Sequence, residues 1–285
     1  MFYVLLTVIS SLAIALILKF NETRKGDRIV VAGANYIVVS VPGFVIAKGN
    51  PTLATPWLGF ALLVGGRFVA GFLLLMKAIR STGLAITGSV ARTATIGPII
   101  LSIIIYHEQP DPLRILGILL GLITFIFLGL SQRADAKKKS YDFGTILLLT
   151  LLFFVMTLNE FSMKIAQANH VEHGPLLFYL FGCSAVICWR IIAFRSIQGK
   201  QQASAAIERH DLLLGGLLGI PSCLASWFLI QALHEVPASV VFPIVSAGGV
   251  VTATLAAVSI WRKQLTRPAW IGIGFAAVAV VLLGG

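Results

Sequence analysis

Glu160 and Lys164 are the two residues of this chain whose types and spacing point first to chemistry. They lie four residues apart in a long apolar stretch, and Glu160 alone among the eleven acidic residues lies well inside such a stretch. Residues i and i+4 share one face of a helix, so we expect the two side chains to stack. Two interpretations stay open: a structural ion pair, or a carboxylate that binds and releases a proton under the influence of Lys164 or a bound solute.

Two arginines, Arg67 and Arg92, also fall in the middle of apolar stretches. Arginine keeps its charge in a protein and therefore needs water, an acid or a ligand. With Lys164 included, three positive groups stand against one negative group, Glu160. An anion such as a carboxylate or a phosphate-bearing metabolite would balance that charge. The alternative is that the arginines extend toward an aqueous surface or bond backbone carbonyls, because a shift of one helical turn changes their depth.

Six further polar or amphipathic side chains lie inside apolar stretches, where they could face a shared cavity. For each of them, hydrogen bonding or packing between helices is the alternative interpretation. These residues are Asn35, Tyr36, Asn159, Trp227, Gln231 and Ser246.

The remaining motifs do not favour catalysis. His170, Glu172 and His173 offer three potential metal ligands in four residues, but no fourth ligand or HExxH spacing accompanies them, so we expect a solvated loop. The chain has no Gly-Lys-Ser/Thr phosphate loop and no recognisable pair of nucleophile and base. A membrane enzyme would gather His, Asp and Glu at one membrane face, whereas His107-Glu108 and His234-Glu235 are only scattered dipeptides. We therefore predict no enzymatic activity, no metal and no cofactor.

Composition determines the elements that must position these residues. Of 285 residues, 58% are hydrophobic and 12% are charged, and the mean hydropathy is +0.94. A soluble domain cannot hide so much apolar surface. The apolar runs are about 18–24 residues long, enough for a helix to cross a hydrocarbon core of about 30 Å. We predict ten transmembrane helices: Phe2–Phe20, Ile29–Ala47, Trp57–Lys77, Leu84–Tyr106, Pro112–Leu130, Thr145–Gln167, Gly174–Phe194, Leu212–Leu233, Ala238–Trp261 and Pro268–Leu283.

The basic residues indicate a lipid bilayer as the partner of this chain, not nucleic acid. The net charge is +11, and most of the 22 Lys and Arg residues lie in the loops after the odd-numbered predicted helices. Such loops are typical of the cytoplasmic face of a membrane, so the charge pattern places both termini outside. Cys183, Cys188 and Cys223 all lie in apolar runs, which predicts packing residues and no disulfide.

The chain carries an internal repeat. Leu75–Pro112 aligns with Leu229–Thr266 without a gap, and Lys19 near the end of the first predicted helix matches Lys164 near the end of the sixth. Five helices per half is an odd number, so the halves have opposite orientations. Inverted repeats are the usual frame of alternating access, with a binding site between them near mid-membrane.

We therefore predict an all-α polytopic membrane protein, in which ten transmembrane helices form two inverted five-helix repeats. Residues 1–131 form the first repeat, residues 132–143 a basic linker, and residues 144–285 the second repeat.

Residues of the last three predicted helices resemble the EamA-type repeat of the drug/metabolite transporter superfamily. They are Gln231 to Pro243 (QALHEVPASVVFP), then Val251-Thr252-Ala253, then Gly272, and the first half matches more loosely through Ala78, Glu108 and Gly117. The resemblance implies ten helices in two inverted repeats and the export or uptake of small metabolites. Many members carry an acidic residue where this chain has Arg262-Lys263-Gln264. The usual orientation of the family also places both termini in the cytoplasm, opposite to the charge pattern.

These features predict a multi-pass protein of the inner or plasma membrane that acts as a secondary active transporter. The expected substrate is a small organic metabolite, anionic or zwitterionic, with proton coupling as an open question and a monomer or homodimer as the working unit. The alternative is an integral-membrane enzyme, a channel or a scaffold without carrier activity.

Overall fold

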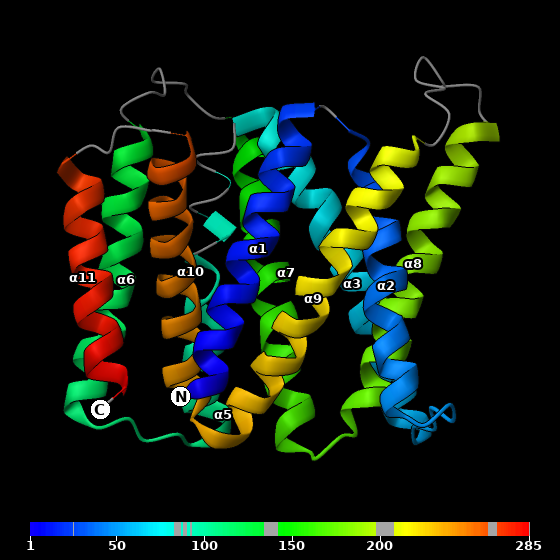
Figure 1. Ribbon diagram of the computed structural model, residues 1–285. Coiled ribbons are helices and arrows are strands. Elements are labelled where there is room, and N and C mark those ends of the chain that lie inside the picture. The colour runs from blue at the N-terminus through cyan, green and yellow to red at the C-terminus, as the bar shows by residue number, and fades with distance from the viewer. Residues whose placement is uncertain are drawn as a thin grey trace. The chain divides into compact units, whose positions relative to one another are not determined.

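A computed structural model describes the chain at residues 1–24, 26–82, 87, 90–91, 93–133, 142–197, 208–261 and 267–284. These residues form ten α-helices and no strand. The helices, shown in Figure 1, are α1 (Phe2–Arg24), α2 (Arg28–Ile46), α3 (Thr55–Thr82), α5 (Ile96–Tyr106), α6 (Pro112–Arg133), α7 (Phe143–Ala168), α8 (His173–Ile197), α9 (Arg209–Glu235), α10 (Ala238–Trp261) and α11 (Arg267–Gly284).

Five of these helices are long and apolar enough to cross a membrane by length and composition, namely α2, α3, α7, α8 and α9. The other apolar helical stretches are shorter within the described part of the chain: Phe2–Leu18, Ile96–Tyr106, Ile115–Thr124, Ala238–Gly249 and Trp270–Leu283. The predicted all-helical, polytopic membrane fold is confirmed.

The predicted continuous helix Leu84–Tyr106 is wrong at its middle. Ala94 and Thr95 form a turn, and α5 begins only at Ile96. The reason is Pro98, which has no N–H to donate to the carbonyl of Ala94 four residues earlier. That carbonyl instead accepts the backbone N–H of Gly97 at 3.0 Å. The other predicted boundaries agree with the structure to within five residues.

The chain folds into two compact units, and each of them combines segments from both halves of the sequence. Unit 1 comprises Met1–Ile9, Ala70–Gln167 and Leu229–Gly285, and unit 2 comprises Ser10–Val69 and Ala168–Phe228. The compact units and the predicted sequence repeats are therefore different divisions of the same chain.

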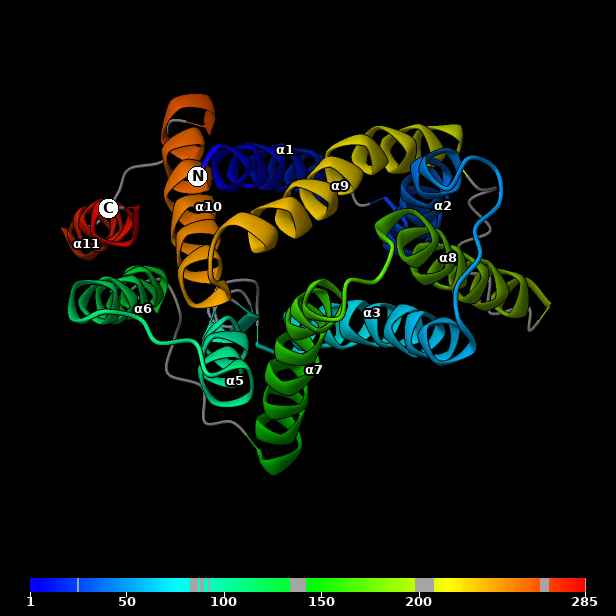
Figure 2. The same ribbon diagram turned by 90° about the horizontal axis from the view of Figure 1, so that it is seen from below.

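Helices at equivalent positions of the predicted repeat pack against each other within each unit. In unit 2, α2 packs along α8, and in unit 1, α6 packs along α11 (Figure 2). Also in unit 1, α10 packs on α5, on α6 and on α11. This is the pairing expected of two related halves.

Glycines bring the helices of unit 2 close together. A Cβ at Gly65 of α3 would collide with the carbonyl oxygen of Leu180 in α8, and a Cβ at Gly215 of α9 would lie 2.5 Å from the carbonyl oxygen of Val31 in α2. One turn later, Gly219 lies against Val38 of α2 in the same way. The spacing Gly215-x-x-x-Gly219 thus serves close helix packing.

Candidate functional site

The second half of α7 carries a polar surface inside an otherwise apolar helix. Thr157, Asn159, Ser162 and Lys164 are all buried, and Glu160 among them is partly buried. An Asp, Lys or Arg at the centre of a membrane span costs roughly 2.5–3.5 kcal/mol on insertion scales, so such groups persist where they have a partner or a function. These side chains point in more than one direction from α7: Thr157 bonds Ala94, and Lys164 pairs with Glu108. They are called here the polar surface of α7.

Lys164 forms its ion pair with Glu108, on the loop between α5 and α6. The Lys164 Nζ atom lies 3.1 Å from Oε1 of Glu108, and their side chains are only 10% and 11% exposed. Lys164 Nζ also lies 5.3 Å from the centroid of the Tyr106 ring at the end of α5, within the range of a cation–π contact. The same ring lies 6.1 Å from that of Phe161, one turn before Lys164.

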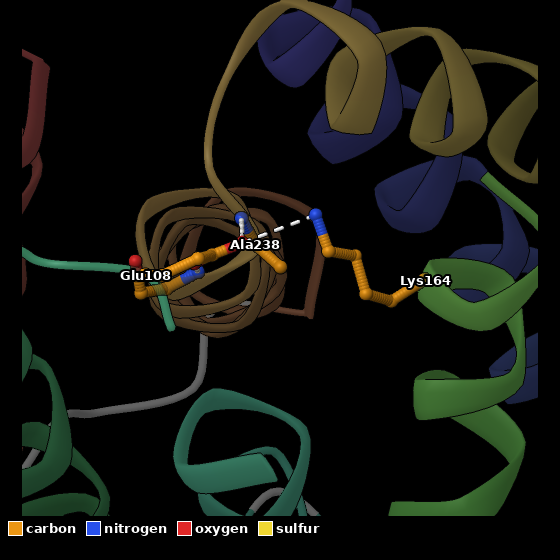
Figure 3. Close-up of polar contacts among 4 residues, drawn as sticks. Glu108, Lys164 and Ala238 are labelled. Carbon is orange, nitrogen blue, oxygen red and sulfur yellow. Dashed lines mark hydrogen bonds and ion pairs between the residues drawn. The ribbon is translucent and has the colours of Figure 1, made fainter. Parts of the chain in front are cut away.

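Glu108 also caps the first turn of α10. The backbone N–H of Ala238 donates to Oε1 at 2.9 Å, and the N–H of Ser239 donates to Oε2 at 2.8 Å (Figure 3). The first N–H groups of a helix have no partner within the helix, and the helix dipole favours a negative charge beside them. One carboxylate therefore joins the end of α5, the second half of α7 and the start of α10.

The electrostatic surroundings of Glu108 keep it ionised. Burial raises its pKa, but hydrogen bonds from Ser239 and Ala238 and the nearby Lys164 ammonium lower it, and the net effect is a pKa below the ordinary value. Glu108 therefore carries its negative charge at neutral pH.

The local sequence explains how Glu108 reaches α10. His107, directly after α5, has a φ of 53°, in the left-handed region. Histidine is one of the non-glycine residues that enters this region more readily than most, and a left-handed residue ends a helix by turning the chain. On the other side, Pro237 precedes Ala238 and cannot extend α9, so a new helix N-terminus begins beside the carboxylate.

A second polar contact lies at the break before α5. The Thr157 hydroxyl donates to the carbonyl oxygen of Ala94 at 2.9 Å, and the hydroxyls of Thr95 and Ser246 lie 2.8 Å apart. All four residues are buried. The Ala94 carbonyl, to which Pro98 cannot donate, thus accepts a hydrogen bond from Thr157 on α7, and Thr95 in the turn bonds Ser246 on α10.

The predicted site residues fall into both units. Asn159, Glu160, Lys164, Gln231 and Ser246 belong to unit 1. Asn35, Tyr36, Arg67 and Trp227 belong to unit 2. Arg92 lies outside the described residues. Lys164 and Ser246 have partners that the sequence argument did not name, which are Glu108 and Thr95.

Two of the four unit 2 residues, Tyr36 and Trp227, contact other rings. Tyr36 is buried and stacks on Phe181, with the ring centroids 5.9 Å apart, and Trp227 meets the ring of His173 edge-on at 6.1 Å. Asn35 is buried, and its Oδ1 atom accepts no hydrogen bond from the described residues. Arg67 is partly buried on α3.

The motif around His170 shows no metal-binding arrangement in the described residues. His170 and Glu172 are exposed, whereas the ring of His173 contacts Trp227. No group of three His, Cys, Asp or Glu side chains that could hold a metal ion occurs in the described part of the chain.

Sequence reasoning missed Glu108 as the partner of Lys164. It singled out the carboxylate within the same helix, because i, i+4 spacing is visible along the chain whereas a contact over 56 positions is not. The sequence did contain a signal for this contact. Glu108 follows an apolar run, and the helix that begins at Ala238, just after Pro237, needs a capping group for its first N–H groups.

Comparisons with known proteins agree with this architecture. The profile of the EamA-like transporter family matches residues 143–285, half of the chain. An uncharacterized protein of Haemophilus influenzae is 20% identical over 216 residues, which cover 74% of this chain and 70% of that protein. A protein of known crystal structure superposes with a TM-score of 0.77 at 15% identity, over 99% of this chain and 98% of its own. At that identity, the likeness concerns the fold alone.

Proposed function

Because this chain belongs to the EamA-like transporter family, we propose that it is a secondary active transporter that carries a small organic metabolite across the plasma membrane by alternating access. Family membership makes it a multi-pass membrane transporter of the drug/metabolite type. The substrate class, the coupling and the mechanism are our proposal.

The polar surface on the second half of α7 is the observation that carries this proposal. Lys164 lies four residues before the end of this 26-residue helix and pairs with Glu108, so Asn159 and Glu160 are the amide and carboxyl groups that lie deeper in the span. Polar groups at this depth usually line a path for a solute or an ion. This surface supports a carrier more than a scaffold.

The charge balance supports an anionic or zwitterionic substrate. Glu108 pairs with Lys164, so Arg67, Arg92 and Glu160 are the remaining charged residues of the predicted spans that we consider as solute contacts. An arginine binds a carboxylate through paired, charge-assisted hydrogen bonds, so a solute that carries a carboxylate, anionic or zwitterionic, is the substrate class that we propose.

Glu160 is our candidate for proton coupling. Glu108 is unsuited to this role, because its lowered pKa keeps it ionised at neutral pH. Glu160 lies on α7, where it is partly buried and stands four residues before the buried Lys164. A proton taken up there would change the charge of the polar surface during the transport cycle.

Counterflow in proteoliposomes tests the proposal. A panel of labelled solutes would include a dicarboxylate, a phosphate ester, a zwitterionic amino acid and a lipophilic cation. We expect saturable exchange of an anion or a zwitterion, because only a carrier exchanges solute without net flux. Exchange of the lipophilic cation alone would contradict the charge argument, and no exchange of any metabolite in a broader library would contradict transport.

The variant Glu160→Gln tests coupling separately. With the exchanged solute as substrate, we expect the variant to lose accumulation driven by a proton gradient and to retain counterflow. The control is Glu172→Gln, since Glu172 is exposed in the loop before α8. Full gradient-driven accumulation by Glu160→Gln would rule out the coupling role.

A further inference from the structure

The contacts of Glu108 link three parts of unit 1 that are far apart in the sequence. Its carboxylate accepts the N–H groups of Ala238 and Ser239 and pairs with Lys164, so the loop after α5, the start of α10 and the second half of α7 meet at one group. Both charged side chains are nearly buried. Removal of the carboxylate would leave an ammonium group and two backbone N–H groups without their acceptor.

We propose that Glu108, Lys164 and the first turn of α10 form a latch that keeps this end of unit 1 closed to water and that opens during transport. The latch is a conformational device within the transporter proposed above. Lys164 and Glu108 act here as positioning residues.

The chemistry of the contact suits a part that opens and closes. A buried ion pair contributes little net stability, because desolvation of both charges offsets their attraction, and apolar residues of similar volume often stabilise a fold as well. Its groups, unlike an apolar contact, can be solvated one by one when water enters. The carboxylate also lies on a loop, which can move without breaking the hydrogen bonds of a helix.

The internal repeat has no glutamate at the position equivalent to Glu108. The gapless alignment of Leu75–Pro112 with Leu229–Thr266 places Arg262 at the position of Glu108, and the earlier match places Lys19 at the position of Lys164. Two cations at the equivalent positions cannot form the same ion pair. Arg262 and the side chain of Lys19 lie outside the described residues, so this comparison rests on sequence.

A cysteine reporter at Ser239 tests the latch without any substrate. Ser239 is 1% exposed, and Ser239→Cys keeps the backbone N–H that bonds Glu108. The native Cys183, Cys188 and Cys223 are replaced by alanine, and the protein is held in lipid nanodiscs, where both faces are open to a charged maleimide. The measurement is the labelling rate of this reporter cysteine, relative to its rate in unfolded protein.

We expect Glu108→Ala to raise this labelling rate about tenfold or more, because it removes charge-assisted hydrogen bonds. Lys164→Met should raise it less, since the two backbone hydrogen bonds to Glu108 remain. Glu235→Ala is the matched control. Glu235 is also a glutamate at a helix end of unit 1, but it pairs with the Met1 amino group at 3.7 Å with its side chain 50% exposed, so its loss should leave labelling unchanged.

Two further results decide against the latch. Unchanged labelling in both Glu108→Ala and Glu108→Gln would overturn it, and so would an equal increase in Glu235→Ala. A general loss of fold is recognised by a second reporter, the native Cys188 restored alone, which is buried in unit 2 and should stay protected in every variant. The labelling rate does not depend on the transport assay. If the cysteine at position 239 is protected in the parent and labelled in Glu108→Ala, the latch is supported even where counterflow detects no transport.

Discussion

The contacts that join α3 to α8 and α2 to α9 in unit 2 differ from those that join α5, α7 and α10 in unit 1. In unit 2, glycines such as Gly65 and Gly215 bring backbones into close contact, and rings such as Tyr36 and Phe181 stack in the remaining space. In unit 1, α5, α7 and α10 meet through a buried ion pair and buried hydroxyl groups. The two kinds of contact overlap, because Gly97 and Gly117 of unit 1 lie close to Thr157 and Leu283, and the Ser184 hydroxyl of unit 2 donates to the Gly65 carbonyl at 2.9 Å. The buried pair of Lys164 and Glu108 belongs to unit 1.

This difference suggests a division of labour between the two units. Closely packed backbones have one arrangement, because any shift opens a void or causes a clash. A hydroxyl or a carboxylate can exchange its protein partner for water or for a solute at modest cost. We therefore expect unit 2 to behave as a rigid part and the α5, α7 and α10 contacts of unit 1 to change during transport.

The largest effect should come from Gly65→Ala in unit 2. The added Cβ would collide with the carbonyl oxygen of Leu180 and lie 3.1 Å from Cβ of Cys183, so α3 and α8 would have to separate. Overpacking of this kind costs about 1–3 kcal/mol, and we expect the upper end because the nearest atom belongs to the backbone. Thermal unfolding in detergent, followed by tryptophan fluorescence, should show a midpoint lowered by several degrees.

Gly66→Ala is the matched control for this substitution. The nearest atom to a Cβ at Gly66 is Cδ1 of Ile187 at 3.8 Å, which is ordinary contact. Alanine is also a better helix former than glycine, so this variant should be as stable as the parent or more stable. Equal destabilisation by the two substitutions would show that α3 and α8 are not held by close approach at Gly65.

The same comparison shows what the sequence could and could not predict. Apolar runs and breakers located the helices, because a membrane span must be continuous and apolar for its full length. The i, i+4 spacing of Gly215 and Gly219 is also visible in the sequence, and it places both glycines on the helix face that packs against α2. These features are local in the chain.

Contacts of unit 1 were harder to predict because they join distant segments. Ala94 to Thr157 and Thr95 to Ser246 are tertiary contacts, and no local pattern names the partner. Pro98 was a visible cause of the break before α5. The sequence, however, did not show that the freed carbonyl of Ala94 is bonded by the hydroxyl of Thr157. In the sequence, Glu108 was only part of a scattered His-Glu dipeptide, and it is the packing of α10 on α5 that brings it to Ser239.

A smaller effect should come from Thr157→Val in unit 1. Valine has nearly the shape of threonine, so the contact with Gly97 is kept while the hydroxyl donor to the Ala94 carbonyl is lost. That carbonyl retains the N–H of Gly97, so we expect destabilisation of about 1 kcal/mol, with a lower unfolding midpoint. Thr150→Val on the same helix is the control. Its exposed hydroxyl bonds only the carbonyl of Ile146 in its own helix, and its loss should be neutral.

The smallest effect should be the response of the Glu108 contacts to moderate acid. The pKa of Glu108 lies below its ordinary value, so its stabilising contribution is fully present above the ordinary carboxyl pKa of about 4.3 and is lost only as the pH falls through the lowered value. Protection of the cysteine at position 239 should therefore be constant from about pH 8 to about pH 5.5, once labelling is normalised to unfolded protein.

The ionisable groups nearest in the chain are His107 and Asp111 beside Glu108, and His234 and Glu235 at the end of α9. Labelling that rises near pH 6 in the parent and also in His107→Gln and His234→Gln would mean that Glu108 itself titrates there. A carboxylate that gains a proton at that pH would be a proton carrier, and the contrast between a fixed charge at Glu108 and a coupling carboxylate at Glu160 would have to be abandoned.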